Sequence, residues 1–182
     1  MKTDLKEYSN IYYRDIKIGG GNINNMFYYD SIIGKIGIVE NGIAITQMNF
    51  VEKMPKGINI IETVLLRRAN KQLQEYFCGK RKIFDLPLAP NGTEFQKKVW
   101  KSLLKIPYGK TNSYKEVAES IGNIKAARAV GSANNKNPII ILIPCHRVIG
   151  ANGKLVGYAG GVDVKEKLLR IEKQIEIERS CI

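Results

Sequence analysis

This sequence has few of the residues that form disulfides or bind transition metals. It has one histidine, His146, and three widely spaced cysteines in 182 residues. An odd number of scattered cysteines predicts no disulfide framework. Without a CxxC or Cys/His grouping, no zinc site is expected either. We therefore expect neither a metal ion nor a cofactor.

Long hydrophobic runs are also missing. No apolar stretch reaches the roughly 20 residues that cross a bilayer, although 44% of the residues are hydrophobic. The first ten residues, MKTDLKEYSN, are polar and lack the apolar segment of a secretory signal. The length suits one large domain or two small ones. We expect a cytoplasmic, globular monomer that does not bind membranes.

Acidic residues are absent from one long interval. The formal net charge is +12, of which residues 89–182 carry +8, and no Asp or Glu lies between Glu119 and Asp163. The basic residues of that interval are Lys125, Arg128, Lys136, Arg147 and Lys154. The net charge alone fits a well-solvated basic surface. An acid-free window is also what a surface facing phosphates needs, because a carboxylate there would repel them.

The first half of the chain has the pattern of an α/β domain. Residues 26–48 alternate apolar runs with turn signals at Asp30-Ser31 and Asn41-Gly42, and Asn-Gly is a strong signal for a two-residue hairpin loop. A small antiparallel sheet is expected there. Residues 61–78 have apolar residues at helical spacing. Glycines and prolines over 79–92 indicate a linker, so we expect an α/β domain at 1–88 and a helical domain at 89–182.

Three motifs predict helix starts in the second half: TEFQ at 93–96, SYKE at 113–116 and DVKE at 163–166. Each places Glu or Gln three residues after a capping residue, the spacing of a capping box, with Asp163 as the cap of the last helix. Asn123 is expected to cap a further helix. Helices at 114–121 and 124–134, joined by Gly-Asn, form a helix-turn-helix candidate.

The second of these two helices is rich in small residues: Ala126, Ala127, Ala129, Gly131, Ser132 and Ala133. Small side chains allow two helices to pack closely. They would also allow close approach to a DNA backbone, with the helix N-terminus near a phosphate and Arg128 projecting into a groove. Both explanations can hold on different faces of the helix.

A cysteine and the only histidine stand together in IILIPCHRVIG, at 140–150. A free thiol has a pKa near 8.5 and needs a base or a cation nearby to act as a nucleophile. The apolar run predicts a buried strand, in which neighbouring side chains point to opposite faces. Direct contact between Cys145 and His146 is then unexpected without a sharp turn or a bridging water. A buried structural cysteine is the alternative.

Five segments carry a family resemblance: GTEFQKKVWKSLLKIPYGKTNSY (92–114), RAVGSAN (128–134), NPIIILIP (137–144), PCHRVIG (144–150) and GYAGGVDVKEKLLRIE (157–172). Together they resemble the O6-alkylguanine-DNA alkyltransferases, also called methylated-DNA–protein-cysteine methyltransferases. The resemblance covers 89–175 and extends more loosely to 61–88. It implies a ribonuclease H-like N-terminal domain beside a mainly helical domain with the helix-turn-helix.

The resemblance also implies a reaction and its catalytic residues. Cys145 would attack the alkyl carbon on guanine O6, and possible repair of O4-alkylthymine stays open. His146 would act through a bridging water and Glu172 would orient it, while Asn137 would support the turn around the site. The thioether product has no good leaving group, so we expect one turnover per chain.

The same resemblance assigns the substrate contacts. Tyr114 would donate to the flipped guanine, and Arg128 would enter the duplex in place of the extruded base. The backbone of Cys145 and Val148 would accept from the guanine amine, the backbone of Ala159 would donate to O6, and Tyr158 and Gly160 would line that loop. The expected partner is double-stranded DNA with alkylated bases. The DNA-binding residues would be Lys125, Ala126, Ala127, Ala129, Gly131 and Arg147.

Two other classes of protein compete with this interpretation. A helix-turn-helix regulator or lesion sensor would bind DNA without chemistry, but such sensors lack the cysteine nucleophile that Cys145 supplies. A Cys-His hydrolase would use the same pair. The sequence shows no oxyanion hole for it, and hydrolysis leaves the basic window unexplained.

Overall fold

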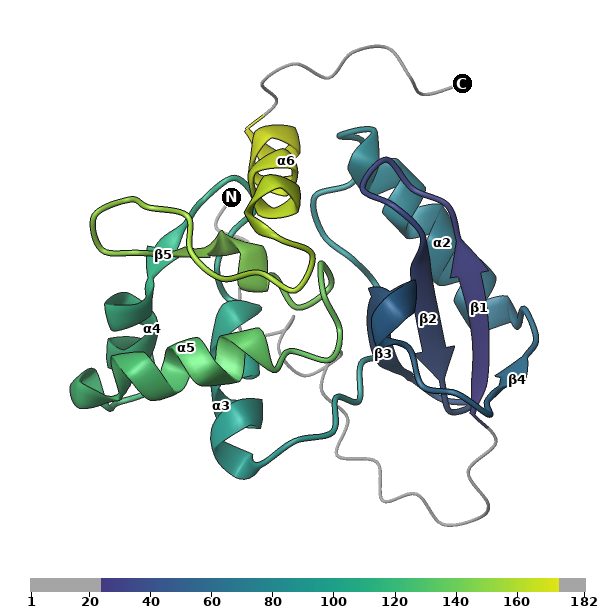
Figure 1. The fold of residues 1–182 in the computed structure, drawn as a ribbon, viewed down its shortest axis with the longest axis horizontal. Helices are drawn as coiled ribbons and strands as arrows, with labels where there is room; N and C mark the ends of the chain where they lie inside the picture. Colours follow the sequence, from purple (N-terminus) through teal and green to yellow (C-terminus); the bar gives the residue numbers. More distant parts are fainter. Residues whose placement is uncertain (1–23, 174–182) are drawn as a thin grey trace, which may run out of the picture.

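An N-terminal sheet and a C-terminal group of helices lie side by side in the structure, a computed structural model that describes residues 24–173 (Figure 1). Buried side chains from both parts belong to one hydrophobic cluster, which includes Ile38 of the sheet and Trp100 of the helices. Among the described residues, no helix is long and apolar enough to cross a membrane. The cytoplasmic location stays a prediction.

The N-terminal sheet has the strand order β3-β2-β1-β4. Its strands are β1 (Asn25–Tyr29), β2 (Ile36–Glu40), β3 (Ile45–Phe50) and β4 (Asn59–Ile60). The first three pair antiparallel, as predicted, but β4 runs parallel to β1. The antiparallel sheet predicted for residues 26–48 is confirmed, and β4, which lies outside that range, makes the whole sheet mixed. A parallel neighbour needs a crossover, and residues 51–58 carry the chain across the sheet, beginning with the short helix η1 (Val51–Lys53).

The turn at Asn41-Gly42 lies where the sequence placed it but is longer than two residues. The side-chain oxygen of Asn41 accepts hydrogen bonds from the backbone N–H of Ile43 (3.2 Å) and Ala44 (2.9 Å). This Asx arrangement organises residues 41–44 as the connection between β2 and β3.

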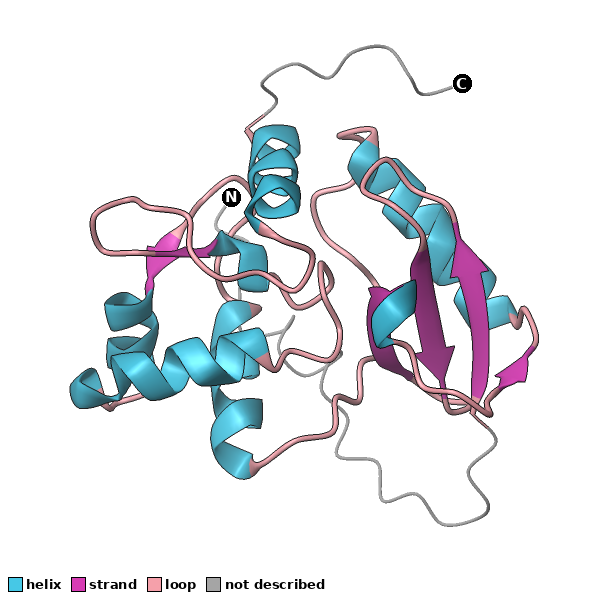
Figure 2. Ribbon diagram, viewed as in Figure 1, coloured by secondary structure: helices cyan, strands magenta, loops and turns pink. Residues whose placement is uncertain are grey.

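One helix, α2 (Val64–Phe77), covers the sheet (Figure 2). Thr63 caps it by accepting from the backbone N–H of Leu66, and its apolar face includes Leu66, Leu73 and Tyr76. Helical spacing of apolar residues predicts this buried face. Tyr76 therefore enters the interior near the C-terminal end of α2.

The C-terminal part contains α3 (Glu94–Leu103), α4 (Tyr114–Ser120), η2 (Ile124–Ala126), α5 (Ala127–Asn135), η3 (Cys145–Arg147) and α6 (Val162–Glu172), with the strand pair β5 (Asn112–Ser113) and β6 (Val148–Ile149). Capping boxes at Thr93 and Ser113 are confirmed. Two predicted caps are wrong. Asn123 makes no capping bond, because a 3-10 turn precedes α5. Gly161, with φ 92°, precedes α6, so Asp163 lies inside its first turn.

The apolar run before Cys145 is a buried turn and not the predicted strand. Pro138 accepts from the N–H of Met48 in β3 (2.8 Å), and the N–H of Ile140 donates to Met48 (3.0 Å). The chain then turns sharply through Ile141, whose φ of 69° is the one positive value for a non-glycine in residues 24–173. A branched side chain is strained in this conformation. Anchoring to the sheet edge and tight burial hold the turn in place.

Candidate active site

Cys145 begins the 3-10 helix η3, directly after this turn. The side chains of Cys145 and His146 are both buried, with exposed fractions of 3% and 0%. The expectation of an extended segment, with the two side chains on opposite faces, is therefore replaced by a tight helical turn. Both functional groups point into the interior from adjacent positions.

His146 forms a hydrogen-bonded pair with the last residue of α6. Its Nε2 lies 2.7 Å from Oε1 of Glu172. The carboxylate can only accept, so Nε2 carries the proton and Nδ1 has a free lone pair. Nδ1 is buried and has no hydrogen-bond partner among the described residues. Burial lowers the pKa of His146 despite the opposing charge of Glu172, which favours a neutral imidazole.

Glu172 is held as a carboxylate by donors on every side. Arg147 donates from Nε to Oε2 (2.9 Å) and from Nη2 to Oε1 (2.9 Å), and the backbone N–H of Gly109 donates to Oε2 (2.9 Å). Burial opposes ionisation, but the bonds and charges of His146 and Arg147 outweigh it and lower the pKa of Glu172 to about 2. The carboxylate keeps its charge throughout the neutral range.

The prediction that Arg147 binds DNA is wrong. Its residue is only 7% exposed, and its Nη1 also donates to the carbonyl of Ile106 over 2.7 Å. The guanidinium contacts Glu172, the backbone of Ile106 and the ring of Tyr108, 5.9 Å from its centroid. The position of Arg147 in the basic window did not show that its charge is neutralised in a buried ion pair.

The thiol of Cys145 is protonated at rest. Burial raises its pKa to about 11, although a hydrogen bond from Asn137 and the charge of Lys165 act in the other direction. At pH 7 only about one thiol in ten thousand is ionised at that pKa. A reaction at the sulfur therefore needs a base that removes the proton as the attack proceeds.

Two buried asparagines fix the backbone around Cys145. Asn137 donates to the carbonyl of Ile143 (2.8 Å) and accepts from the N–H of Ile139 (3.0 Å), so it spans the turn. Asn134 donates to the carbonyl of Cys145 (3.3 Å). Such bonds hold the strained turn and set the direction of the thiol.

The loop from Val156 to Gly160 forms another wall of the site. The Val156 carbonyl accepts from the hydroxyl of Tyr114 (3.3 Å) and from Lys165 Nζ (2.9 Å), and Lys165 also donates to the carbonyl of Val148 (2.5 Å). Burial, with the neighbouring Cys145, raises the pKa of Tyr114. The Tyr158 hydroxyl is buried and has no hydrogen-bond partner in the described part of the chain.

The sheet domain supports this loop from behind. Lys53 of η1 donates to the Ala159 carbonyl over 2.6 Å. The ring of Phe50 packs so closely on Gly160 that an added Cβ would lie 2.3 Å from a ring carbon. Only glycine fits at position 160, because the Phe50 ring occupies the space of a side chain.

Comparison with known proteins places these features in one family. The family model described as "6-O-methylguanine DNA methyltransferase, DNA binding domain" matches residues 94–174, and "6-O-methylguanine DNA methyltransferase, ribonuclease-like domain" matches 26–90. The methylated-DNA–protein-cysteine methyltransferase of Methanosarcina acetivorans is 51% identical over 154 residues, covering 81% of this chain and 98% of the relative. The chain belongs to the methylated-DNA–protein-cysteine methyltransferase family.

Solved structures of the methyltransferase family share its fold. A crystal structure of Mycobacterium tuberculosis OGT in complex with DNA is 45% identical, with a TM-score of 0.78, and covers 82% of this chain and 93% of the other. Bacillus subtilis has a constitutive methylated-DNA–protein-cysteine methyltransferase that is 54% identical over 113 residues, covering 62% of this chain and 68% of the relative. The predicted fold class is confirmed: a ribonuclease-like α/β domain and a helical DNA-binding domain.

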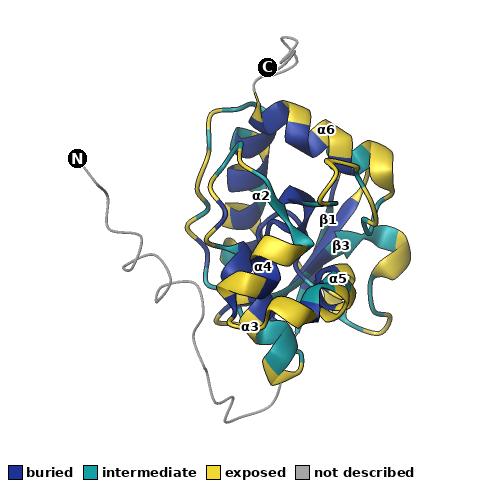
Figure 3. Cartoon of the chain, turned by 90° about the vertical axis from the view of Figure 1, so that its left-hand side faces the viewer, coloured by how far each residue is buried: buried dark blue, intermediate teal, exposed yellow. Residues whose placement is uncertain are grey.

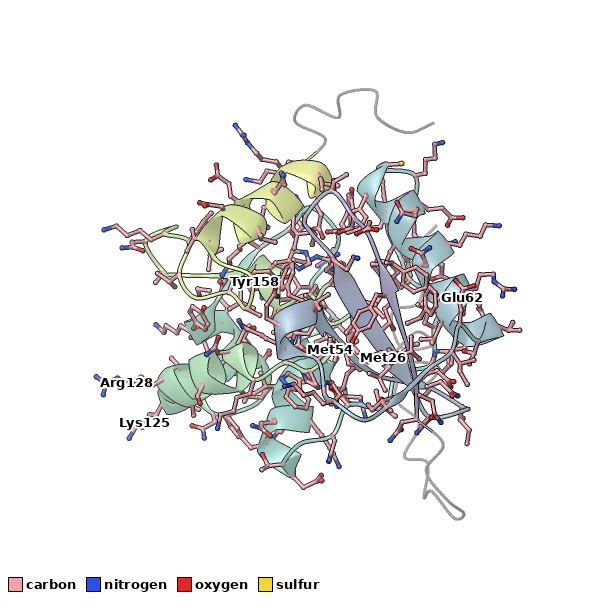
Figure 4. The ribbon with its side chains drawn as sticks, turned by 45° about the vertical axis from the view of Figure 1, so that its right-hand side comes forward. Met26, Met54, Glu62, Lys125, Arg128 and Tyr158 are labelled. Atoms are coloured by element: carbon pink, nitrogen blue, oxygen red, sulfur yellow. The ribbon has the colours of Figure 1, made fainter. Side chains whose placement is uncertain are left out.

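The helix-turn-helix of this methyltransferase presents two basic side chains to solvent. Lys125 and Arg128 project from the outer end of the α4–α5 pair (Figure 4), and exposed residues follow both helices (Figure 3). Ala129 is exposed as well. Ala126 is only 9% exposed, so its side chain is buried, and its assignment to the DNA-binding residues stays a prediction.

The small residues of η2 and α5 allow close helix packing, the first of the two predicted purposes, while their approach to DNA stays a prediction. Ala126 and Ala133 are buried against neighbouring elements. Gly131 and Ala127 are half-buried, and a Cβ at Gly131 would lie 3.7 Å from the ring of Tyr114. Close packing of α5 on α4 keeps Tyr114 beside the site, while the outer face stays open.

Four residues of the site were not identified from the sequence. Asn134 and Lys165 lie inside the quoted segments, but nothing in their spacing showed that they bind backbone carbonyls. Tyr76 and Lys53 come from the sheet domain, and only the tertiary fold brings them to the site. The hydroxyl of Tyr76 donates to Oε1 of Glu172 over 2.8 Å.

Proposed function

We propose that this methyltransferase repairs DNA by direct reversal, moving the alkyl group of O6-alkylguanine to its own Cys145. The observation that supports this most strongly is the buried thiol, next to an imidazole whose Nε2 is bound to a carboxylate and whose Nδ1 is free. Such an imidazole can accept a proton but cannot leave its position.

The proposed reaction uses only side chains of the protein, a water molecule and the alkylated base. The proton of Cys145 passes to Nδ1 of His146 through a bridging water. The sulfur attacks the alkyl carbon, the S–C bond forms and the C–O6 bond breaks. The electron pair returns to guanine. The Tyr114 hydroxyl exchanges its bond to the Val156 carbonyl for one to guanine, and this bond offsets the developing charge. Glu172 stabilises the imidazolium that results.

The depth of Cys145 requires the target base to leave the duplex. A base in the stack cannot bring O6 to a thiol that is 3% exposed. We place the flipped guanine between the Tyr114 ring and the loop of Tyr158, Ala159 and Gly160. Arg128 fills the gap in the duplex. Lys125 of η2 and Ala127, Ala129 and Gly131 of α5 lie on the segment that approaches the DNA backbone.

Backbone groups recognise the guanine through hydrogen bonds. The carbonyls of Cys145 and Val148 accept from its amine, and the N–H of Ala159 donates to O6. Lys165 already donates to the Val148 carbonyl, and a carbonyl oxygen has a second lone pair for the base. The Cys145 carbonyl accepts from Asn134 and from the N–H of Val148, so the guanine amine displaces or shares one of these two bonds.

The test is a titration of duplex DNA containing labelled O6-methylguanine against a fixed amount of protein. We expect transfer to stop near one equivalent, because a thioether has no good leaving group, with the added mass on Cys145. The Cys145→Ser variant should bind DNA and accept no label. Continued repair beyond one equivalent, or label at another residue, would refute the proposal.

The same assay with O4-methylthymine in place of the guanine lesion decides the wider substrate range.

A helix-turn-helix regulator would bind both DNAs and gain no mass. A hydrolase would turn over a thioester or ester substrate many times without retaining an alkyl group.

A further inference from the structure

One hydrogen bond to Glu172 comes from outside the DNA-binding domain. Tyr76, the penultimate residue of α2, is fully buried. Its hydroxyl donates to Oε1 over 2.8 Å and lies 3.4 Å from Nε2 of His146. The helix that covers the sheet therefore reaches the carboxylate that holds the imidazole.

We propose that Tyr76 is a positioning residue for alkyl transfer, which holds Glu172, and through it His146, in the geometry that the proton transfer needs. The inference rests on the proposed function, because it assumes that His146 receives the proton of Cys145. Tyr76 itself touches neither the substrate nor the reacting atoms.

The geometry makes Tyr76 and His146 share one oxygen. Burial, followed by the charge and hydrogen bond of Glu172, raises the pKa of Tyr76 well above its ordinary value, so the hydroxyl stays a donor. Each donor to Oε1 withdraws part of the charge available to the others. Without the hydroxyl, Oε1 would stabilise the imidazolium more strongly and would be free to shift.

The surroundings of Tyr76 restrict its movement. Its ring contacts the rings of Phe77 (5.6 Å between centroids), Phe84 (5.3 Å) and Tyr108 (6.0 Å). Aromatic neighbours on several sides fix a ring in one orientation. The hydroxyl can therefore serve as a rigid reference for the carboxylate.

Other titratable or charged groups around the His146–Glu172 pair come from every neighbouring element. They are Cys145 and Arg147 of η3, Lys165 of α6, Tyr158 of the active-site loop and Tyr108 before β5. Substituting Arg147 or Lys165 changes the charge of the site, and substituting Cys145 removes the nucleophile. Tyr76→Phe removes one donor from Glu172 and leaves all charges in place.

The first measurement follows the imidazole of His146 by NMR across the pH range. His146 is the only histidine of the chain, so its signals need no assignment by mutation. We expect Tyr76→Phe to raise the pKa of His146 and Glu172→Gln to lower it. Tyr29→Phe is the matched control, because this buried tyrosine donates to another glutamate, Glu62, over 3.0 Å. It should leave His146 unchanged.

The second measurement is the rate of alkyl transfer as a function of pH. Tyr76→Phe should slow transfer roughly tenfold, the size expected for a lost hydrogen bond to a charged group, because the misplacement of His146 outweighs its gain in basicity. As the pH falls, an imidazole with a raised pKa takes up its proton at a higher pH. The acidic limb of the pH–rate profile of Tyr76→Phe should therefore move to higher pH. In the Glu172→Gln background the same change should have little further effect, since the tyrosine acts through the carboxylate.

The outcomes separate this inference from the proposed function. An unchanged His146 titration in Tyr76→Phe overturns the inference, whether or not the protein transfers alkyl groups. So does a slower rate with an unmoved acidic limb, or a full effect in the Glu172→Gln background, because both indicate packing alone. Absence of label on Cys145 in the wild-type protein counts against the proposed function instead.

Discussion

At the scale of single residues, the carboxylate of Glu172 connects the parts of the site. It accepts from Tyr76, Gly109, His146 and Arg147. Its charge and that of Arg147 cancel, which makes burial of both tolerable. His146 is thus bound to a carboxylate whose charge is already largely compensated.

Replacing Glu172 by Gln should impair transfer through His146. The amide is a weaker acceptor for Nε2–H, so the imidazolium loses stabilisation and accepts the proton of Cys145 less readily. We expect a rate at pH 7 that is lower by roughly a hundredfold, within the usual contribution of a general base. Rapid-quench transfer assays measure the rate, and thiolate absorbance against pH checks that the nucleophile itself is not impaired.

A control for this substitution must separate chemistry from folding, because Gln leaves the guanidinium of Arg147 without its partner. Circular dichroism establishes that the variant is folded under the assay conditions. A folded Glu172→Gln protein with the wild-type rate would remove Glu172 from the proton relay.

At the scale of elements, we propose different roles for the two faces of the α4–α5 pair, one holding the lesion and the other binding the duplex. The inner face of α5 packs on α4 and keeps Tyr114 beside the site. The outer end carries Lys125 and Arg128 into solvent (Figure 4). A change on the outer end should therefore alter the use of duplex DNA without altering the chemistry.

Replacing Arg128 by Ala should weaken repair of duplex DNA about tenfold, comparable to the loss of a stacking contact with one base. Transfer from free O6-alkylguanine base should stay close to the wild-type rate, because the side chain replaces the extruded base and not a catalytic group. Single-turnover rates on the two substrates measure the difference.

Lys136→Ala is the matched control for this helix, since Lys136 is exposed at the other end of α5. It should weaken DNA binding modestly and in a salt-dependent way, as expected for loss of one positive charge near phosphates. Equal losses on duplex and free base in Arg128→Ala would contradict the role given to Arg128.

At the scale of the whole molecule, the buried ion pair links the site to acid stability. The pKa of Glu172 falls from an ordinary value of 4.5 to about 2 in the folded protein. A lowered carboxyl pKa stabilises the fold above about pH 4.5, and this contribution is lost as the pH falls toward 2. The lowered pKa of His146 acts in the same direction, because the unfolded chain binds its proton more readily.

The contribution of Glu172 to the free energy of unfolding should therefore fall by about 3 kcal/mol as the pH drops from about 4.5 to about 2. Urea denaturation of the wild-type protein and of Glu172→Gln at a series of pH values measures it. The difference in stability between the two proteins should narrow in acid. A constant difference from pH 7 to pH 3 would show that the pair does not titrate as described.

The sequence by itself determined the local elements and the chemistry of the site. Capping residues Thr93 and Ser113 mark helix starts through bonds within four residues, so their helices could be read directly. The Pro-Cys-His-Arg block, the small residues of the second helix and the acid-free window pointed together to a DNA-binding domain with a nucleophile. Family membership and the fold class follow from these segments.

Only the tertiary structure decided which side chains meet. Arg147 is basic and lies in a basic window, yet it is buried on Glu172, because the partner is 25 residues away in the sequence. The apolar run before Cys145 is a strained turn, since backbone bonds to Met48 of β3 hold it there. Tyr76 reaches Glu172 across 96 positions. Contacts at such separations depend on how the elements pack in three dimensions, within the C-terminal domain for Arg147 and between the domains for Met48 and Tyr76, and no local pattern of residues encodes them.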